Sequence, residues 1–196
     1  MVNSNEIISF LNKEKKCNEE ISEKHEEIKK IIDVLINARD KGNSIYVMGN
    51  GGSGSTASHF VSDLLKTAIL KNKNRFNAIS LVDNIPVILA WSNDVSFDDI
   101  FEQQLVNYLH DGDVVIVFSG SGNSQNILKA LKYCSKLNIT SIGFSGSTGG
   151  KMKKLCTMCL TVPSTDMLLI ESSHVVICHC IISYIRNKGI PQFKYE

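Results

Sequence analysis

The stretch DVVIVFSGSGNSQNILKALKYCSKLNITSIGFSG, residues 113–146, decides the fold class. It opens with a continuous apolar run, turns at serine and glycine, carries a helical period over 124–138, and then repeats an apolar run that ends in glycine. A strand, a helix and a second strand in this order are typical of a crossover between parallel strands. Parallel strands are buried on both faces, which explains why these runs lack an alternating polar pattern.

The same unit recurs on both sides of this stretch. Residues 44–49, 78–82 and 157–163 also have the pattern of buried strands. Strands that alternate with helices predict a mainly parallel sheet with helices on both faces. We therefore expect an α/β three-layer sandwich with five strands. The helical patterns fall at 55–70, from Ile85 onward, at 99–110, at 124–138 and at 167–187.

The N-terminal part of the chain is helical in pattern but differs in composition. Residues 3–41 are rich in Glu, Lys, Ile and Asn and contain no proline or glycine. Their apolar positions recur at steps of three and four, which predicts one or two amphipathic helices that end at Lys41-Gly42. One small sheet cannot cover this whole apolar stripe. We expect a single domain, 1–196, in which residues 1–42 pack between subunits and residues 43–196 form the α/β core.

Length, charge and composition exclude several classes of protein. A chain of 196 residues fits one domain, and its 21 basic and 20 acidic side chains give a formal net charge of +1. That balance gives no electrostatic footprint for nucleic acid or an anionic membrane. The first 16 residues carry too many charges for a signal peptide, and no run approaches the roughly 20 apolar residues of a membrane span. We expect a cytoplasmic protein with reduced cysteines and with no nucleic acid or membrane partner.

Three loops rich in glycine and serine follow predicted strands, at 49–55, 119–124 and 145–150. They lie at the edge of the sheet where α/β proteins bind ligands. The first amides of a helix lack internal partners and attract anions, so Ser119, Ser121 and Ser124 can converge on one phosphate. The loop at 119–124 lacks both the lysine of a P-loop and the spacing G-x-G-x-x-G, so we expect no nucleotide cofactor. The alternative is that these serines only cap a helix.

These loops and their neighbours resemble the sugar isomerase (SIS) domain family, and within it the sedoheptulose-7-phosphate isomerases. The resemblance implies a flavodoxin-like fold with five strands and a homotetramer whose active sites lie between subunits. It also implies conversion of sedoheptulose 7-phosphate to D-glycero-D-manno-heptose 7-phosphate for the synthesis of surface polysaccharide such as capsule or lipopolysaccharide. The matching motifs are GNGGS (49–53) with His59 and Asp63 behind it, SND (92–94), SGSGNS (119–124), GGKM (149–152), VPSTD (162–166) and ESSHVVICHCI (171–181).

The resemblance also implies where the substrate binds. The serine loop after the strand at 113–118 would hold the phosphate, and the other matching residues would contact the sugar hydroxyls or orient the acid–base group. The implied substrate-binding residues are Asn50, Gly51, Gly52, Ser53, Asn93, Asp94, Ser119, Gly120, Ser121, Ser124 and Glu171.

His59 and Asp63 lie four residues apart in a helical segment, so they share one face. An aldose–ketose isomerisation needs a base beside the carbonyl carbon and a partner that moves protons between oxygens. By the resemblance, Asp63 is the carboxylate base, His179 is the acid–base partner, and Glu171 is a further catalytic residue. The resemblance further implies that His59, Asp63, Glu171 and His179 can hold zinc, as in some members of the family.

Two positions depart from the family's pattern, which usually has glutamate at Asp63 and glutamine at Glu171. The carboxylate has either moved between these positions with the chemistry kept, or the change marks a different sugar phosphate. Helix geometry limits the implied zinc site, because residues 171 and 179 on one straight helix lie about 12 Å apart along its axis. They can share a metal only if the helix begins near 171 or bends, or if different subunits contribute the ligands.

Several residues also have a plainer interpretation. The motifs CTMC (156–159) and CHC (178–180) could form a zinc site, but their spacing points the cysteines in different directions, and buried thiols are the favoured interpretation. His174 in an apolar helix is expected to be a core residue. A second functional class also stays open: a non-catalytic SIS-fold protein that binds a partner or senses a sugar phosphate, like the DnaA initiator-associating factor.

Overall fold

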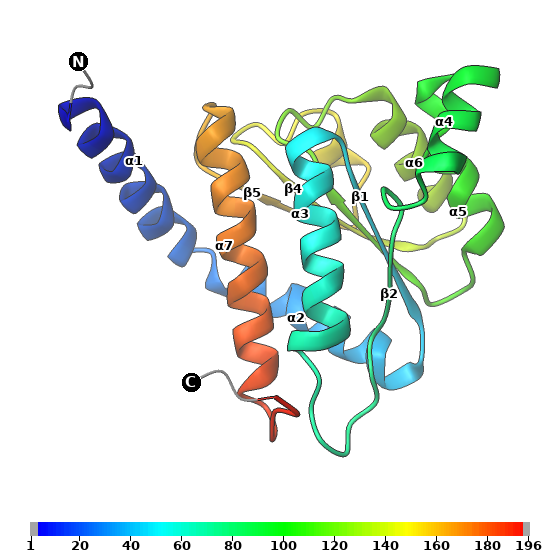
Figure 1. Ribbon diagram of the computed structural model, residues 1–196, viewed down its shortest axis with the longest axis horizontal. Coiled ribbons are helices and arrows are strands. Elements are labelled where there is room, and N and C mark those ends of the chain that lie inside the picture. Colours follow the sequence, from blue (N-terminus) through cyan, green and yellow to red (C-terminus); the bar gives the residue numbers. More distant parts are fainter. Residues whose placement is uncertain (1–3, 194–196) are drawn as a thin grey trace.

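The computed structural model describes residues 4–193 and shows five parallel strands between two layers of helices (Figure 1). The strand order is β2-β1-β3-β4-β5, the order of flavodoxin-like proteins, so the predicted fold class is confirmed. The order reverses between β1 and β3, which creates a ligand-binding crevice at their carboxyl ends. The strands are β1 Ser44–Gly49, β2 Asn77–Ser80, β3 Val114–Phe118, β4 Thr140–Ser145 and β5 Met158–Thr161.

The two faces of the sheet carry separate apolar cores. Along β3, Ile116 and Phe118 pack toward α2, α3 and α7, whereas Val115 and Val117 pack toward α5 and α6. Both sets are fully buried, as the continuous apolar run of this strand predicts. The helices are α1 Ser4–Ser22, α2 His25–Lys41, α3 Gly51–Ser62, α4 Ile85–Asp94, α5 Glu102–Tyr108, α6 Gln125–Lys136 and α7 Met167–Arg186.

The N-terminal segment forms two helices, α1 and α2, as the periodicity predicts. The chain bends between them at Lys24, whose ammonium donates to the carbonyl and hydroxyl oxygens of Thr161 at the end of β5. Helix α2 ends at Gly42, which adopts φ 76°. Helix α1 projects away from the sheet (Figure 1), with Ile7, Ile8 and Leu11 exposed along it.

Helix α3 begins at Gly51, four residues before the predicted start at residue 55. Glycine permits this early start because the chain folds back on itself directly after β1. A Cβ atom on Gly49 would lie only 2.5 Å from the Ser53 carbonyl oxygen, and one on Gly54 only 3.0 Å from the Gly49 carbonyl oxygen. The early start brings the first amides of α3 directly to the carboxyl edge of the sheet.

Helix α7 corrects one expectation about the chain. By length and composition, Met167–Arg186 is apolar enough to cross a membrane, with a mean hydropathy of 1.7 over its most apolar window. The expectation that no run approaches a membrane span was therefore wrong. Half of that window is buried inside the protein, and the helix packs in the core beside α3 (Figure 1). Its apolar character thus has the ordinary explanation of a core helix.

His174 on α7 is a core residue, as expected. Its ring is fully buried between Phe118 and Phe144, with centroid separations of 5.7 and 6.3 Å. Burial lowers the pKa of His174 to about 4, against an opposing effect of the Ser145 backbone. Neither ring nitrogen has a hydrogen-bond partner of ordinary geometry among the described residues. The ring is therefore neutral in the folded protein near pH 7.

This buried ring predicts a loss of stability in acid. The pKa of His174 is lower in the folded state than the ordinary value of 6.5, so its contribution is complete above pH 6.5 and is lost as the pH falls toward 4. We expect its share of the unfolding free energy to fall by about 2 kcal/mol between pH 7.5 and pH 5. Urea unfolding of His174→Leu at both pH values should show a correspondingly smaller difference, and an unchanged difference would contradict the assignment.

Candidate active site

The loop SGSGNS, residues 119–124, connects the end of β3 to α6 at the crevice. The Ser119 hydroxyl accepts from the Gly122 amide at 3.2 Å, and the Ser121 hydroxyl accepts from the Asn123 amide at 3.2 Å. Ser124 is the N-cap residue of α6, yet its side chain makes no capping hydrogen bond within the described chain. The capping alternative therefore fails for Ser124, whose hydroxyl stands at a helix N-terminus available to an anion.

A second loop supports this one from the side. The Met152 amide donates to the Gly122 carbonyl at 2.9 Å, and the Lys151 amide donates to the Asn123 side-chain oxygen at 3.1 Å. Gly122 itself adopts φ 63°. These contacts explain the sequence GGKM at 149–152, because that loop fixes the backbone that presents the serines.

The loop after β1 is held next to the serine loop by hydrogen bonds between two side-chain amides. Asn50 and Asn126 exchange two side-chain hydrogen bonds of 3.0 and 2.9 Å, and the Asn126 oxygen also accepts from the Ile127 amide. Asn126 lies two residues after Ser124, so this pair fixes the start of α3 relative to the start of α6. The sequence gives no signal for this role of Asn126, because only the fold brings its amide to Asn50.

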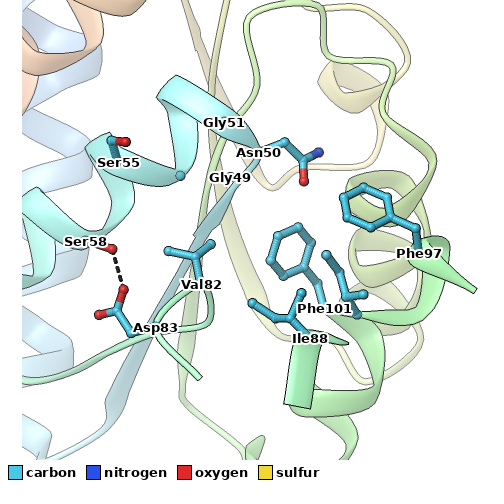
Figure 2. A pocket seen from close by; sticks show the side chains of 12 residues that line it. Gly49, Asn50, Gly51, Ser55, Ser58, Val82, Asp83, Ile88, Phe97 and Phe101 are labelled. Carbon is cyan, nitrogen blue, oxygen red and sulfur yellow. Dashed lines mark hydrogen bonds between the residues drawn. The ribbon is translucent and has the colours of Figure 1, made fainter. Parts of the chain in front are cut away.

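A pocket of about 330 Å³ opens beside the start of α3, at the ends of β1 and β2 (Figure 2). Asn50 and Gly51 line one side, and Phe97 and Phe101 line the other. The implied substrate residues Asn93 and Asp94 do not line it. They lie exposed at the end of α4, where the Asn93 amide donates to the Asp94 carboxylate at 2.8 Å.

Glu171, in the first turns of α7, places its carboxylate beside the start of α3 and not beside the middle of that helix. A Cβ atom added to Gly52 would collide with the carboxylate of Glu171. The absence of a side chain at Gly52 lets this carboxylate lie against the first turn of α3. A carboxylate is favourable there because the amides at a helix N-terminus carry partial positive charge.

A second polar cluster lies farther along α3 and α7. The His59 and His179 Nε2 atoms are 3.4 Å apart, and the Asp63 Oδ2 atom lies 3.6 and 3.7 Å from them. The histidine side chains are 49% and 56% exposed, so the cluster faces outward. Its ligand atoms all lie within 4.8 Å of one another, the one such group of three found among the described residues.

Asp63 is oriented by the backbone as well as by its neighbours. It begins a short π-helix, Asp63–Thr67, where the helix widens by one residue. This turn brings the Thr67 hydroxyl within 2.8 Å of Asp63 Oδ1, to which it donates. The bond leaves Oδ2 facing the two histidines. Two imidazoles and one carboxylate are ordinary zinc donors, so these three residues fit the implied metal.

The four residues that the resemblance assigns to one zinc site are thus not together within one chain. Glu171 and His179 are eight residues apart on α7, which corresponds to about 12 Å along the helix. Glu171 lies at the level of Gly52 and the serine loop, whereas His179 lies at the level of His59. A metal role for Glu171 stays a prediction that requires a second subunit.

Comparison with known proteins agrees with this architecture. Residues 9–146 match the family described as SIS domain, which makes the chain a SIS-domain protein. A phosphoheptose isomerase from Clostridium acetobutylicum is 35% identical over 163 residues, 83% of either chain, and one from Aliarcobacter butzleri is 34% identical over 93% of this chain and 96% of its own. The solved structure of a phosphoheptose isomerase from Francisella tularensis is 27% identical, with a TM-score of 0.89, and covers 95% of this chain and 100% of its own.

The chain therefore belongs to the phosphoheptose isomerase family of SIS-domain enzymes. The family recognised in the sequence motifs is confirmed.

Proposed function

We propose that this protein converts sedoheptulose 7-phosphate to D-glycero-D-manno-heptose 7-phosphate. The observation that carries the proposal is the His59–Asp63–His179 cluster, because it supplies a carboxylate and imidazoles in mutual contact. Relatives named phosphoheptose isomerase, which cover most of the chain, support the choice of substrate. A non-catalytic protein would not need this cluster, so the alternative function is not favoured.

The reaction moves one hydrogen from C1 to C2 and a second hydrogen from the C1 oxygen to the C2 oxygen. Asp63 takes a proton from C1 of the ketose, and the electrons of that C–H bond form an enediolate with the C2 oxygen. His179 moves a proton between the two oxygens, and return of a proton to C2 gives the aldose. A zinc ion held by His59, Asp63 and His179, when bound, would polarise the carbonyl.

In the proposed complex the substrate spans two regions. The phosphate lies on Ser119, Ser121 and Ser124 at the α6 N-terminus, where amides and hydroxyls are free to donate. The start of α3 and Glu171 bind sugar hydroxyls. Asn93 and Asp94, which lie away from the pocket in one chain, keep a role as hydroxyl ligands only if assembly brings them to the substrate.

The distance between the two regions supports a homotetramer with shared active sites. The reactive cluster lies about 12 Å along α7 from Glu171, so a cluster from another subunit would complete the site around the serine loop. Two surfaces suit such assembly. One is the exposed apolar stripe of α1, and the other is a groove of about 440 Å³ lined by Ile28, Ile32, Val176 and their neighbours. Large exposed apolar surfaces mark protein contacts.

Assembly can be checked directly. Light scattering at micromolar concentration is expected to give the mass of a tetramer. A stable monomer with full activity would contradict the shared site.

The phosphate assignment predicts a selective loss of binding. Ser121→Ala/Ser124→Ala is expected to raise KM at least ten-fold, roughly 1.4 kcal/mol, with kcat less affected. Folding should be retained, because Ser124 makes no capping bond within the described chain. Ser135→Ala, at the far end of α6, is a matched control that should leave KM unchanged. An unchanged KM in the folded double variant would contradict the assignment.

We also propose that the protein acts in the cytoplasm, where its product would enter the synthesis of nucleotide-activated heptose for surface polysaccharide. All six cysteines are free thiols, which fits a reducing compartment. Burial raises the pKa of Cys134 and Cys156 to about 12, so these thiols are unreactive near neutral pH.

A further inference from the structure

A second cavity opens directly on the reactive cluster. It holds about 420 Å³, and both Asp63 and His179 line it. The remaining lining residues are Thr67, Ile182, Ser183 and Arg186. The proposed mechanism gives no role to Thr67, Ser183 or Arg186, although they face the same space as the base and the acid–base partner.

Arg186 lies on α7, the helix that also carries His179. It follows His179 by seven residues, which is nearly two full turns, so the two side chains share one stripe of α7. The guanidinium is half-buried, and its Nη2 atom donates to the Phe193 carbonyl at 3.4 Å. An arginine side chain stays charged throughout the pH range of an enzyme. The cavity thus has a permanent positive charge on the same stripe as the histidine.

The proposed reaction moves negative charge within this space, from the Asp63 carboxylate to the substrate. Removing a proton from C1 transfers charge to the substrate oxygens, next to a carboxylate that was itself anionic. Such charge is stabilised best by donors fixed before the reaction begins. Arg186 provides a fixed cation and the Ser183 hydroxyl a further donor, while the Thr67 hydroxyl donates to Asp63 and holds that carboxylate in place.

We propose that this cavity is an oxyanion subsite in which Arg186 binds the enediolate oxygens of the substrate. The inference rests on the proposed isomerase function and adds a residue to it. Arg186 acts on substrate charge that is absent from the ground state, so its loss affects turnover more than substrate binding. Its guanidinium also distinguishes this region from the serine loop, which binds phosphate through hydroxyls and amides.

Turnover of three variants tests the role. Arg186→Gln is expected to lower kcat on sedoheptulose 7-phosphate by about 10²-fold with KM changed less than three-fold. Arg186→Lys keeps the charge, and its kcat should be at least ten-fold higher than that of Arg186→Gln. Lys188→Gln removes the same charge two residues away, where the ammonium lies over the Tyr184 ring, and should match the wild type. Equal kcat in Arg186→Gln and the wild type would overturn the proposal.

A binding measurement separates this proposal from the function on which it rests. Glycolohydroxamate is a planar two-carbon mimic of an enediolate, and calorimetry with a chelator present measures its binding without metal. The wild type and Lys188→Gln should bind it, and Arg186→Gln should bind at least ten-fold more weakly. Equal binding by Arg186→Gln, or no binding by the wild type, would overturn the subsite. Absence of turnover in a wild type that binds the mimic would contradict the isomerase function alone.

Discussion

His179→Asn is expected to reduce kcat on sedoheptulose 7-phosphate by about 10²–10⁴-fold, the range of a general acid–base group. The His179 Nε2 atom lies 3.4 Å from His59 Nε2 and 3.7 Å from Asp63 Oδ2, which places its imidazole beside the base, where it can move a proton between the substrate oxygens. Asp63→Asn should fall in the same range, because an amide cannot take the C1 proton. Steady-state kinetics on purified variants measures both effects.

The fold should survive these changes. The His179 side chain is 56% exposed, so its replacement creates no cavity in the core. His110→Asn, in an exposed position after α5, is the matched control and should keep full activity. If His179→Asn and Asp63→Asn both turn over substrate like the control, the mechanism proposed for this cluster is wrong.

Gly122→Ala is expected to raise KM by about two orders of magnitude while the protein stays folded. Gly122 adopts φ 63°, and a Cβ atom there would run into the backbone carbonyl of Gly149. The two loops must separate to admit the methyl group, which moves the serines away from the α6 N-terminus. A misplaced donor loses most of its contribution to binding.

Gly42→Ala separates this effect from simple backbone strain. Gly42 has a similar φ of 76°, but its Cβ would meet no atom within 4 Å, and it lies at the end of α2 away from the loops. Both variants should lose about 1 kcal/mol of stability from the left-handed conformation. Only Gly122→Ala should change KM, and equal KM values in the two variants would contradict the packing argument.

The sequence predicts the parallel sheet because its central strand, β3, is apolar and buried on both faces. Val115 and Ile116 point to opposite layers, and only a buried parallel strand needs both to be apolar. Element ends are less predictable. Phe97–Asp99 forms a 3-10 turn and α5 begins at Glu102, although the helical pattern starts at residue 99. Local periodicity does not register such a change in hydrogen bonding.

The candidate site is predictable in its residues but not in their grouping. His59 and Asp63 share a helix face by spacing alone, and the structure adds His179 to them. The π-helix that orients Asp63 has no signal in the sequence. Glu171 was assigned to the same metal site by resemblance, and only the packing of α7 against Gly52 shows that it lies elsewhere in its own chain.

The central claim is that this chain isomerises a seven-carbon sugar phosphate, and turnover measures it most directly. Purified protein incubated with sedoheptulose 7-phosphate in D₂O can be followed by NMR, which detects both the aldose product and exchange of the C1 hydrogen. We expect formation of D-glycero-D-manno-heptose 7-phosphate and deuterium incorporation, both reduced at least 100-fold in His179→Asn. Unchanged ketose with no exchange in the wild type, with and without added zinc, would contradict the account.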